Sequence, residues 1–314
     1  MRIKNGIIRV SGCLMILFGV LMIAPSSASA ISANTGGWSI NVAPDGATAE
    51  SEDDTVGLNT WVSEVVPDSM FQQWFWGRIG DAGPEISLDN LPLLSASNPA
   101  PNEIFLEYGV PGGLPFGGPL DAVAVDIHYE LIELSVSESI IRETVNVTNI
   151  LDTTIDLHWF EYTDLDIAGT ITDAGAFPQS GGTSIVQTDI DGVTNVDVRV
   201  VDGDMPDRWE IERFPLLVNS LNDGGPTTLA NASFLVGPED YTHAFEWVNT
   251  LHSGESLSYE KEKHATVGGF SGGDPDDPFI PDPCFDLLFA PAWCFPPVPV
   301  VPGVFWWFDP VVAT

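Results

Sequence analysis

The chain has 314 residues and carries ten Lys and Arg against 45 Asp and Glu, which gives a formal net charge of −35 at pH 7. Binding to phosphate groups requires clustered basic side chains, so this charge excludes nucleic acid as a partner and disfavours anionic lipid. Its simplest interpretation is solubility in an extracellular or saline medium, and the alternative is binding of divalent cations.

The first 30 residues have the features of a cleavable signal peptide. Three basic residues in the first nine precede an apolar run at 13–23, and Ala28 and Ala30 provide small side chains at the positions that a signal peptidase reads. We expect cleavage after Ala30 and a secreted protein, extracellular or periplasmic. A lipoprotein is disfavoured because the apolar run follows Cys13 instead of preceding it. The run is also shorter than the ~20 residues of a bilayer span, so no membrane span is expected after cleavage.

Residues 31–267 alternate apolar and polar side chains with a period of two. From Val123 to Leu131 every second residue is apolar, while Asp126, His128 and Glu130 share the opposite face. This is the pattern of a half-buried strand. Further strands are expected at 155–159, 195–200, around 61, and at 71–79, 104–108, 141–147, 184–188, 209–213, 233–236, 244–250 and 257–263.

Gly, Pro, Asn and Asp clusters separate these strands, and no segment has a capped apolar stripe of helical period. The sequence therefore predicts an all-β fold, a large antiparallel β-sandwich formed by residues 31–267. The tryptophans on its strands, Trp159 and Trp247 in particular, are predicted to be core residues.

Residues 268–314 form a tail rich in Gly, Pro, Asp and aromatic residues, which excludes a regular strand or helix. Cys284 and Cys294 lie ten residues apart in it, and we expect a local disulfide between them. Two thiols with no His nearby cannot complete a zinc site.

Several turns place carboxylates one residue apart beside glycine, which is an arrangement that Ca²⁺ favours. The candidate metal ligands are Asp164, Asp166, Asp189, Asp191, Asp202, Asp204 and Asp207. None of these turns fits the twelve-residue helical calcium loop. Because Asp-Gly is also ordinary turn chemistry, calcium and a purely structural role both remain open.

The sequence contains no nucleophile elbow, no His-Glu-x-x-His, no phosphate loop and no dinucleotide-binding glycine motif. Two weaker features could bind a glycan. Asp126, His128 and Glu130 could bind a metal ion or act as acid and base on a glycan, although any exposed sheet face gives this pattern. Trp74 and Trp76 could stack on a sugar ring, with burial in the core as the alternative.

Several short segments of residues 70–265 resemble secreted bacterial proteins of the exosortase-sorted kind, whose C-terminal signal contains Pro-Glu-Pro. They are Phe75-Trp-Gly-Arg-Ile-Gly80, Gly83-Pro-Glu85, Asn146-Val-Thr-Asn149, Phe160-Glu-Tyr-Thr-Asp-Leu-Asp166, and Trp247 ahead of Leu251-His-Ser-Gly-Glu-Ser256. The chain departs from that family in having Pro281-Asp282-Pro283 and in ending at Ala313-Thr314, without the sorting signal. The resemblance implies an envelope or matrix protein of a Gram-negative bacterium.

Together these features predict a secreted, non-catalytic envelope or extracellular-matrix protein, stabilised by cations if the acidic turns bind calcium. The alternatives are a carbohydrate-binding module and, third, a glycan-active enzyme, which the absence of a catalytic motif disfavours. A glycan or another envelope protein is the partner that these functions would require.

Overall fold

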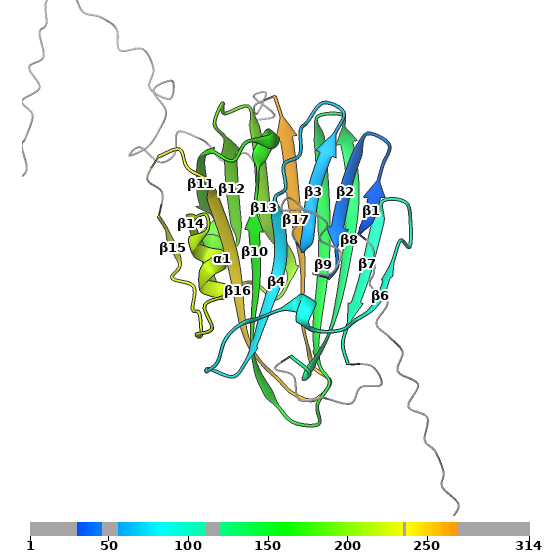
Figure 1. Cartoon of the computed structure of the whole chain (residues 1–314), viewed down its shortest axis with the longest axis vertical. Helices are drawn as coiled ribbons and strands as arrows, with labels where there is room; N and C mark the ends of the chain where they lie inside the picture. The colour runs from blue at the N-terminus through cyan, green and yellow to red at the C-terminus, as the bar shows by residue number, and fades with distance from the viewer. Residues whose placement is uncertain (1–29, 46–55, 111–119, 235–236, 269–314) are drawn as a thin grey trace, which may run out of the picture. The chain divides into compact units, whose positions relative to one another are not determined.

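The computed structural model describes residues 30–45, 56–110, 120–234 and 237–268. These residues form two large β-sheets that face each other in a sandwich (Figure 1), as the sequence predicts. In these ranges, no helix is both long and apolar enough to cross a membrane. Most of the predicted signal peptide and nearly all of the tail, including Cys284 and Cys294, lie outside the described residues.

Sheet A has nine strands, and its central members are β4, β10 and β16. Its strands in spatial order are β1 (Ile31–Asn34), β2 (Trp38–Ala43), β3 (Gly57–Ser63), β4 (Gln72–Ile79), β10 (Ile155–Asp164), β16 (Tyr241–Leu251), β14 (Arg208–Arg213) and β15 (Ala232–Ser233), with β5 (Ile86–Ser87) paired to β4. The join between β3 and β4 is narrow, because Leu58 opposite Gln73 is the one residue pair in their register.

Sheet B has eight strands and is antiparallel throughout its described pairings. Its order is β11 (Asp173–Gln179), β12 (Ser184–Asp189), β13 (Thr194–Gly203), β17 (Ser256–Val267), β9 (Glu138–Asn149), β8 (Val123–Ser135), β7 (Glu103–Tyr108) and β6 (Leu93–Ser97). In β8 the burial alternates residue by residue from Val123 to Leu131, so the apolar side chains face sheet A and the polar ones face outward.

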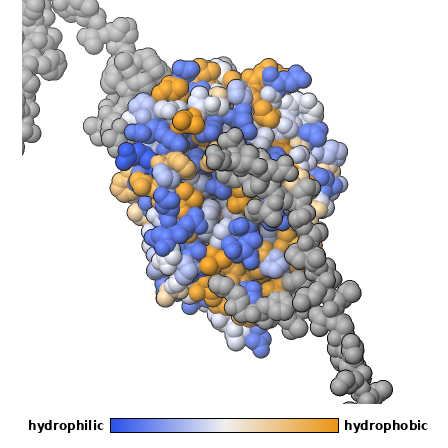
Figure 2. Space-filling model, viewed as in Figure 1, coloured by the Kyte–Doolittle hydropathy of each residue, from blue (hydrophilic) through white to orange (hydrophobic). Residues whose placement is uncertain are grey.

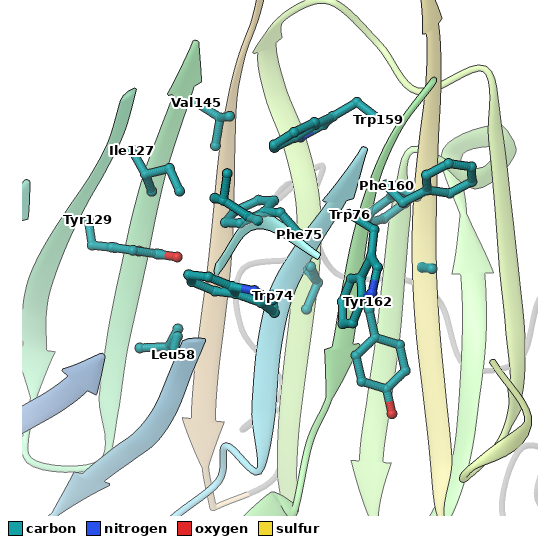
Figure 3. Close-up of a cluster of buried hydrophobic side chains, with 14 of the residues drawn as sticks. Leu58, Trp74, Phe75, Trp76, Ile127, Tyr129, Val145, Trp159, Phe160 and Tyr162 are labelled. Carbon is teal, nitrogen blue, oxygen red and sulfur yellow. The ribbon is translucent and has the colours of Figure 1, made fainter. Parts of the chain in front are cut away.

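Aromatic side chains fill the space between the sheets (Figure 3). Phe75 stacks on Trp159 with ring centroids 5.6 Å apart, and Trp247 stacks on Tyr259 at 4.1 Å. Trp159 and Trp247 are fully buried, which confirms their prediction as core residues. Gly77 is required opposite Trp159, because a Cβ there would lie 2.9 Å from Leu120 Cδ2 and 3.3 Å from the indole ring.

Short helical segments interrupt the strands. They are the 3-10 turns η1 (Leu88–Asn90), η3 (Ile167–Gly169) and η4 (Ser180–Gly182) and the α-helix α1 (Leu216–Leu221). Helix α1 buries Leu217 and Leu221 and packs beside β14 and β16. On the face of the molecule seen in Figure 2, hydrophilic and hydrophobic residues are interspersed.

Candidate functional site

Strand β10 is buried on both faces, which is unusual for an antiparallel sheet that has one face on the core. Trp159 faces sheet B, since its Nε1 donates to the Tyr259 hydroxyl at 3.3 Å. Because side chains alternate along a strand, His158, Phe160 and Tyr162 face away from sheet B. All three are nevertheless buried, so other segments must cover the outer face of sheet A.

Two neighbouring rows of side chains cross this outer face in register. In the first row Phe160 lies between Trp76 on β4 and Glu246 on β16, and Glu246 pairs in turn with Arg208 on β14. In the second row His158 lies between Arg78 and Val248. Cross-strand partners point to the same face, so charged and aromatic side chains are concentrated here.

His158 and Glu246 form a hydrogen-bonded pair at the centre of these rows. His158 Nδ1 lies 3.0 Å from Glu246 Oε1, which also receives Arg208 Nη1 at 3.1 Å. Glu246 Oε2 accepts the backbone N–H of Leu229 at 3.0 Å. A carboxylate with these partners acts as an acceptor, so the Nδ1 nitrogen of His158 carries the hydrogen.

The other ring nitrogen of His158 is therefore available for proton exchange. Nε2 makes no hydrogen bond and lies 3.5 Å from Asp81 Oδ1, whose side chain is 97% exposed. His158 itself is 7% exposed. This places a histidine, oriented by a buried carboxylate, beside an exposed carboxylate at the protein surface.

A second ion pair fixes the segments that cover the outer face. Arg78 Nη1 contacts Glu85 Oε1 and donates to the carbonyl of Thr227 at 2.9 Å, and its guanidinium lies 5.8 Å from the centroid of the Phe160 ring. Glu85 Oε1 also accepts the Thr227 N–H at 2.8 Å. We call Arg78, Asp81, His158, Arg208 and Glu246 the His158 site.

Trp74 and Trp76, the predicted sugar-stacking residues, are 0% and 3% exposed. Trp74 Nε1 donates to Ser87 Oγ at 3.0 Å, and Trp76 Nε1 donates to Asn222 Oδ1 at 3.1 Å. Trp76 also packs edge-on against Tyr162. Neither indole presents a free ring face to solvent, and Trp74 packs against Phe75 and Tyr108.

Four of the acidic-turn residues accept hydrogen bonds from backbone N–H groups, as ordinary turn carboxylates do. Their donors are Val193 for Asp189, Gly203 for Asp202, Ser258 for Asp204 and Val248 for Asp207, at 2.7–2.9 Å. Asp191 lies in the turn between β12 and β13. In the described part of the chain no group of three or more His, Cys, Asp and Glu could hold a metal ion.

Asp164 and Asp166 belong to an acidic cluster that the sequence pattern finds only in part. The structure brings them together with Asp173 and Asp240. Burial raises the pKa values of both Asp164 and Asp166, and the charge of Asp240 adds to each shift. Burial raises the pKa of Asp173 to about 8 and that of Asp166 to about 6. Asp173 Oδ2 accepts from Gln187 Nε2 at 2.7 Å and from the Tyr241 N–H at 3.2 Å, while its Oδ1 is unpartnered.

Asp126, His128 and Glu130 share the outer face of sheet B, as predicted. His128 Nε2 lies 3.3 Å from Glu103 Oε2, and Glu130 Oε2 accepts from Arg142 Nη1 at 3.2 Å. Burial and the charge of Glu107 raise the pKa of Asp126. These side chains pair with neighbouring strands instead of converging on one another.

The sequence patterns did not single out Glu246, Arg208 or Asp81. The predicted strands place His158 and Glu246 on their polar faces, and the sequence indicates nothing more about these two residues. His158 and Glu246 are 88 residues apart in the chain, and they meet because their strands pair. Periodicity within one strand does not predict which strands pair.

No protein-family model matches the sequence, and no curated protein sequence matches it. Several solved structures are similar to it over most of its length. An aldose 1-epimerase-like protein of Escherichia coli K12 is 9% identical with a TM-score of 0.43, and the match covers 76% of this chain and 99% of that one. A galactose mutarotase related enzyme of Lactobacillus acidophilus is 8% identical with a TM-score of 0.42, covering 77% and 98%. A galactose mutarotase-like protein of Lactobacillus casei is 7% identical with a TM-score of 0.40, covering 76% and 100%.

The main functional prediction from the sequence, a non-catalytic envelope or extracellular-matrix protein, is wrong against these neighbours, which are described as epimerase- and mutarotase-like proteins. Period-two patterns describe the strands but not the pairing that creates the His158 site, so they carry no information about that site. The alternative, a carbohydrate-binding module, stays a prediction.

Proposed function

We propose that this chain binds a carbohydrate at the His158 site. One observation carries the proposal: Glu246 holds His158 by its Nδ1 atom at 3.0 Å, which directs the unbonded Nε2 toward exposed Asp81 at the surface. Sugar hydroxyl groups both donate and accept hydrogen bonds. His158 Nε2 and the Asp81 carboxylate both offer acceptor atoms to such hydroxyl groups.

The rim of the site is open enough for a ligand to approach. The side chains of Arg208 and Asp81 are 35% and 97% exposed, and Val248 beside His158 is 37% exposed. The rim therefore combines a cation, an anion and an apolar surface around one histidine, which suits the mixed polar and apolar faces of a sugar ring.

The charge of the chain favours a neutral sugar over an acidic one. Every Lys and Arg after residue 30 lies within 4.0 Å of a carboxylate; these residues are Arg78, Arg142, Arg199, Arg208, Arg213, Lys261 and Lys263. With a net charge of −35 and its cations paired, the surface repels uronates and sulfated glycans.

A glycan array followed by calorimetry on the best neutral ligand tests this function. The variant His158→Ala should lose binding at least tenfold, whereas His128→Ala should bind as the wild type does. His128 is the matched control, because it is also a strand histidine beside a glutamate, on the outer face of sheet B. Equal loss in both variants, or no neutral ligand on the array, would overturn the proposal.

The same geometry supports a second function, interconversion of the anomers of a reducing sugar. A histidine that keeps one nitrogen on a buried carboxylate can exchange a proton through the other nitrogen. Nε2 removes the proton of the anomeric hydroxyl, the bond between C1 and the ring oxygen breaks, and the ring oxygen takes a proton from water. After rotation about C1–C2 the reverse steps close the ring on the other face of the aldehyde, and the proton on Nε2 returns to the anomeric oxygen. Proton NMR of a freshly dissolved aldose should show that its anomers equilibrate faster with wild-type protein than with the His158→Asn variant. Equal rates would contradict this second function and leave carbohydrate binding as the only proposal.

Secretion is part of the proposal and is supported by the basic start, the apolar run and the alanines ahead of residue 31. N-terminal sequencing of protein recovered from the periplasm or medium of a Gram-negative host should begin at Ile31. Alkylation of thiols before and after reduction should show Cys284 and Cys294 protected until reductant is added. Free thiols in the unreduced protein would contradict the disulfide.

A further inference from the structure

Two lysines and two glutamates are enclosed between the sheets. Lys261 and Lys263 lie on β17, Glu143 lies on β9 opposite Lys261, and Glu161 reaches them from β10 in sheet A. All four side chains are 0% exposed. Isolated charges at such a depth cost several kcal/mol each, so the state of these groups requires an explanation.

The two lysines have different partners. Lys263 Nζ makes a hydrogen bond to Glu143 Oε2 and lies 3.4 Å from Gln73 Oε1. Lys261 Nζ is in direct contact with Glu161 Oε1, and Lys263 Nζ lies 3.8 Å from the same oxygen. The amine of Lys261 and the carboxyl group of Glu161 therefore touch in a space closed to solvent.

The remaining contacts of Glu161 are those of a carbonyl group. Its Oε2 accepts from the Tyr259 hydroxyl at 3.3 Å, and that hydroxyl is in turn held by Trp159 Nε1 at 3.3 Å. Oε1 therefore faces the amine, and Oε2 faces a donor. Glu143 Oε2 lies 3.8 Å from Lys261 Nζ, near enough to exchange a proton with small movements.

Burial supports a reactive amine at this position. It lowers the pKa of Lys261 well below its ordinary value, with the neighbouring Lys263 adding to the effect and Glu143 opposing it. A neutral amine is the nucleophilic form. Burial and Lys263 also lower the pKa of nearby His243 to about 3, so this histidine adds no charge.

We propose that Lys261 and Glu161 form an intramolecular amide bond from Nζ to Cδ. A proton passes from the ammonium group to the Glu161 carboxylate, which gives a neutral amine and a carboxylic acid. Nζ then attacks Cδ, and Glu143 takes a proton from Nζ. Glu143 delivers this proton to the hydroxyl at Oε1, which leaves as water. Oε2 remains as the amide carbonyl oxygen and accepts from the Tyr259 hydroxyl. One N–C bond forms, one C–O bond breaks and one water is released, with no oxidant or cofactor.

The bond would remove two of the four buried charges and leave the Lys263–Glu143 pair balanced. It would also connect β10 of sheet A covalently to β17 of sheet B, across 100 residues of chain. No motif in the sequence indicates it, because the reacting residues meet only when the two sheets pack.

Mass spectrometry of the full-length wild-type protein tests the proposal directly. We expect tryptic digestion to leave the bond after Lys261 uncut and to yield a branched peptide containing Lys261 and Glu161, one water lighter than its two parts. The variant Lys261→Arg should lack the branched peptide and migrate more slowly on a denaturing gel, as an open chain does. Cleavage after Lys261 in folded wild-type protein, with Glu161 recovered in an unmodified peptide, would overturn the proposal.

A second variant tests the role of Glu143. In Glu143→Gln the amide cannot shuttle the proton, so the branched peptide should form at least tenfold more slowly after refolding than in the wild type. Lys263→Met is the matched control, because it removes the neighbouring lysine of β17 and retains Lys261, Glu161 and Glu143; it should still yield the branched peptide. Formation at the wild-type rate in Glu143→Gln would exclude Glu143 from the reaction.

Discussion

Glu246 and His158 are 88 residues apart in the chain and 3.0 Å apart in the fold, joined through the pairing of β16 with β10. The carboxylate is fully buried, and His158 is 7% exposed. Glu246 holds the Nδ1 atom of the ring, and the Nε2 atom lies 3.5 Å from exposed Asp81. The two should therefore respond differently to substitution.

Replacing Glu246 with Ala should destabilise the protein, whereas His158→Ala should affect mainly ligand binding. Loss of the carboxylate leaves the buried N–H of Leu229 without its acceptor, at a cost of about 1–3 kcal/mol. His158 can be lost with a smaller effect because its Nε2 makes no hydrogen bond and Glu246 Oε1 keeps Arg208 as a donor. Urea denaturation of both variants measures the difference, and equal losses would show that His158 is also structural.

Replacing Trp159 with Ala should lower the free energy of unfolding by ~3–5 kcal/mol, since a fully buried indole is removed from between the sheets. The exposed Phe177→Ala is the control and should change stability by less than about 0.5 kcal/mol. Chemical denaturation measures the free energy of unfolding of both variants, and the two values can be compared if its dependence on denaturant concentration is the same in both. A Trp159 variant of wild-type stability would mean that the core repacks around the cavity.

Stability should fall as the pH rises from about 4 to about 8. Burial raises the pKa of Asp173 from 3.8 to about 8, so between these values the folded state binds more protons than the unfolded state. The contribution is complete below the unfolded pKa and is lost as the pH passes through the folded pKa. Thermal melting across this range should give a smaller slope for Asp173→Asn than for the wild type; an unchanged slope would place the titration elsewhere.

Calcium, magnesium and sodium salts should raise the melting temperature equally at matched ionic strength. The described residues contain no group of three or more His, Cys, Asp and Glu that could hold a metal ion, and screening by salt acts on any acidic surface. A higher melting temperature in calcium alone would support the prediction of a specific site. Loss of that effect in a variant with Asn at Asp164 and Asp166 would then place it in the acidic cluster.

Periodicity predicts most of the sandwich, because half-buried strands such as β8 alternate their side chains residue by residue. It misses the short or irregular strands β1, β2, β5, β6 and β11, of which β6 and β11 have register shifts against their partners. It also misses α1, whose six residues are too few to show a helical period.

The candidate site was less predictable than the fold, since it depends on long-range pairing. His158 was assigned to a polar strand face, but nothing local indicates that Glu246 and Arg208 lie beside it. For Trp74 and Trp76 the sequence leaves sugar stacking and core burial open, and both are buried. Their indole nitrogens donate to Ser87 and Asn222, which lie outside the central strands of sheet A.

The narrow join between β3 and β4 divides sheet A into two blocks that share little backbone pairing. β3 approaches β4 at Gly57, where a Cβ would lie 2.2 Å from the carbonyl oxygen of Gln73, and only the Leu58–Gln73 pair continues the ladder. The first three strands are thus attached to the rest of the protein chiefly through side chains. Their amide hydrogens should exchange with solvent as a separate cooperative unit, ahead of those in β4, β10 and β16.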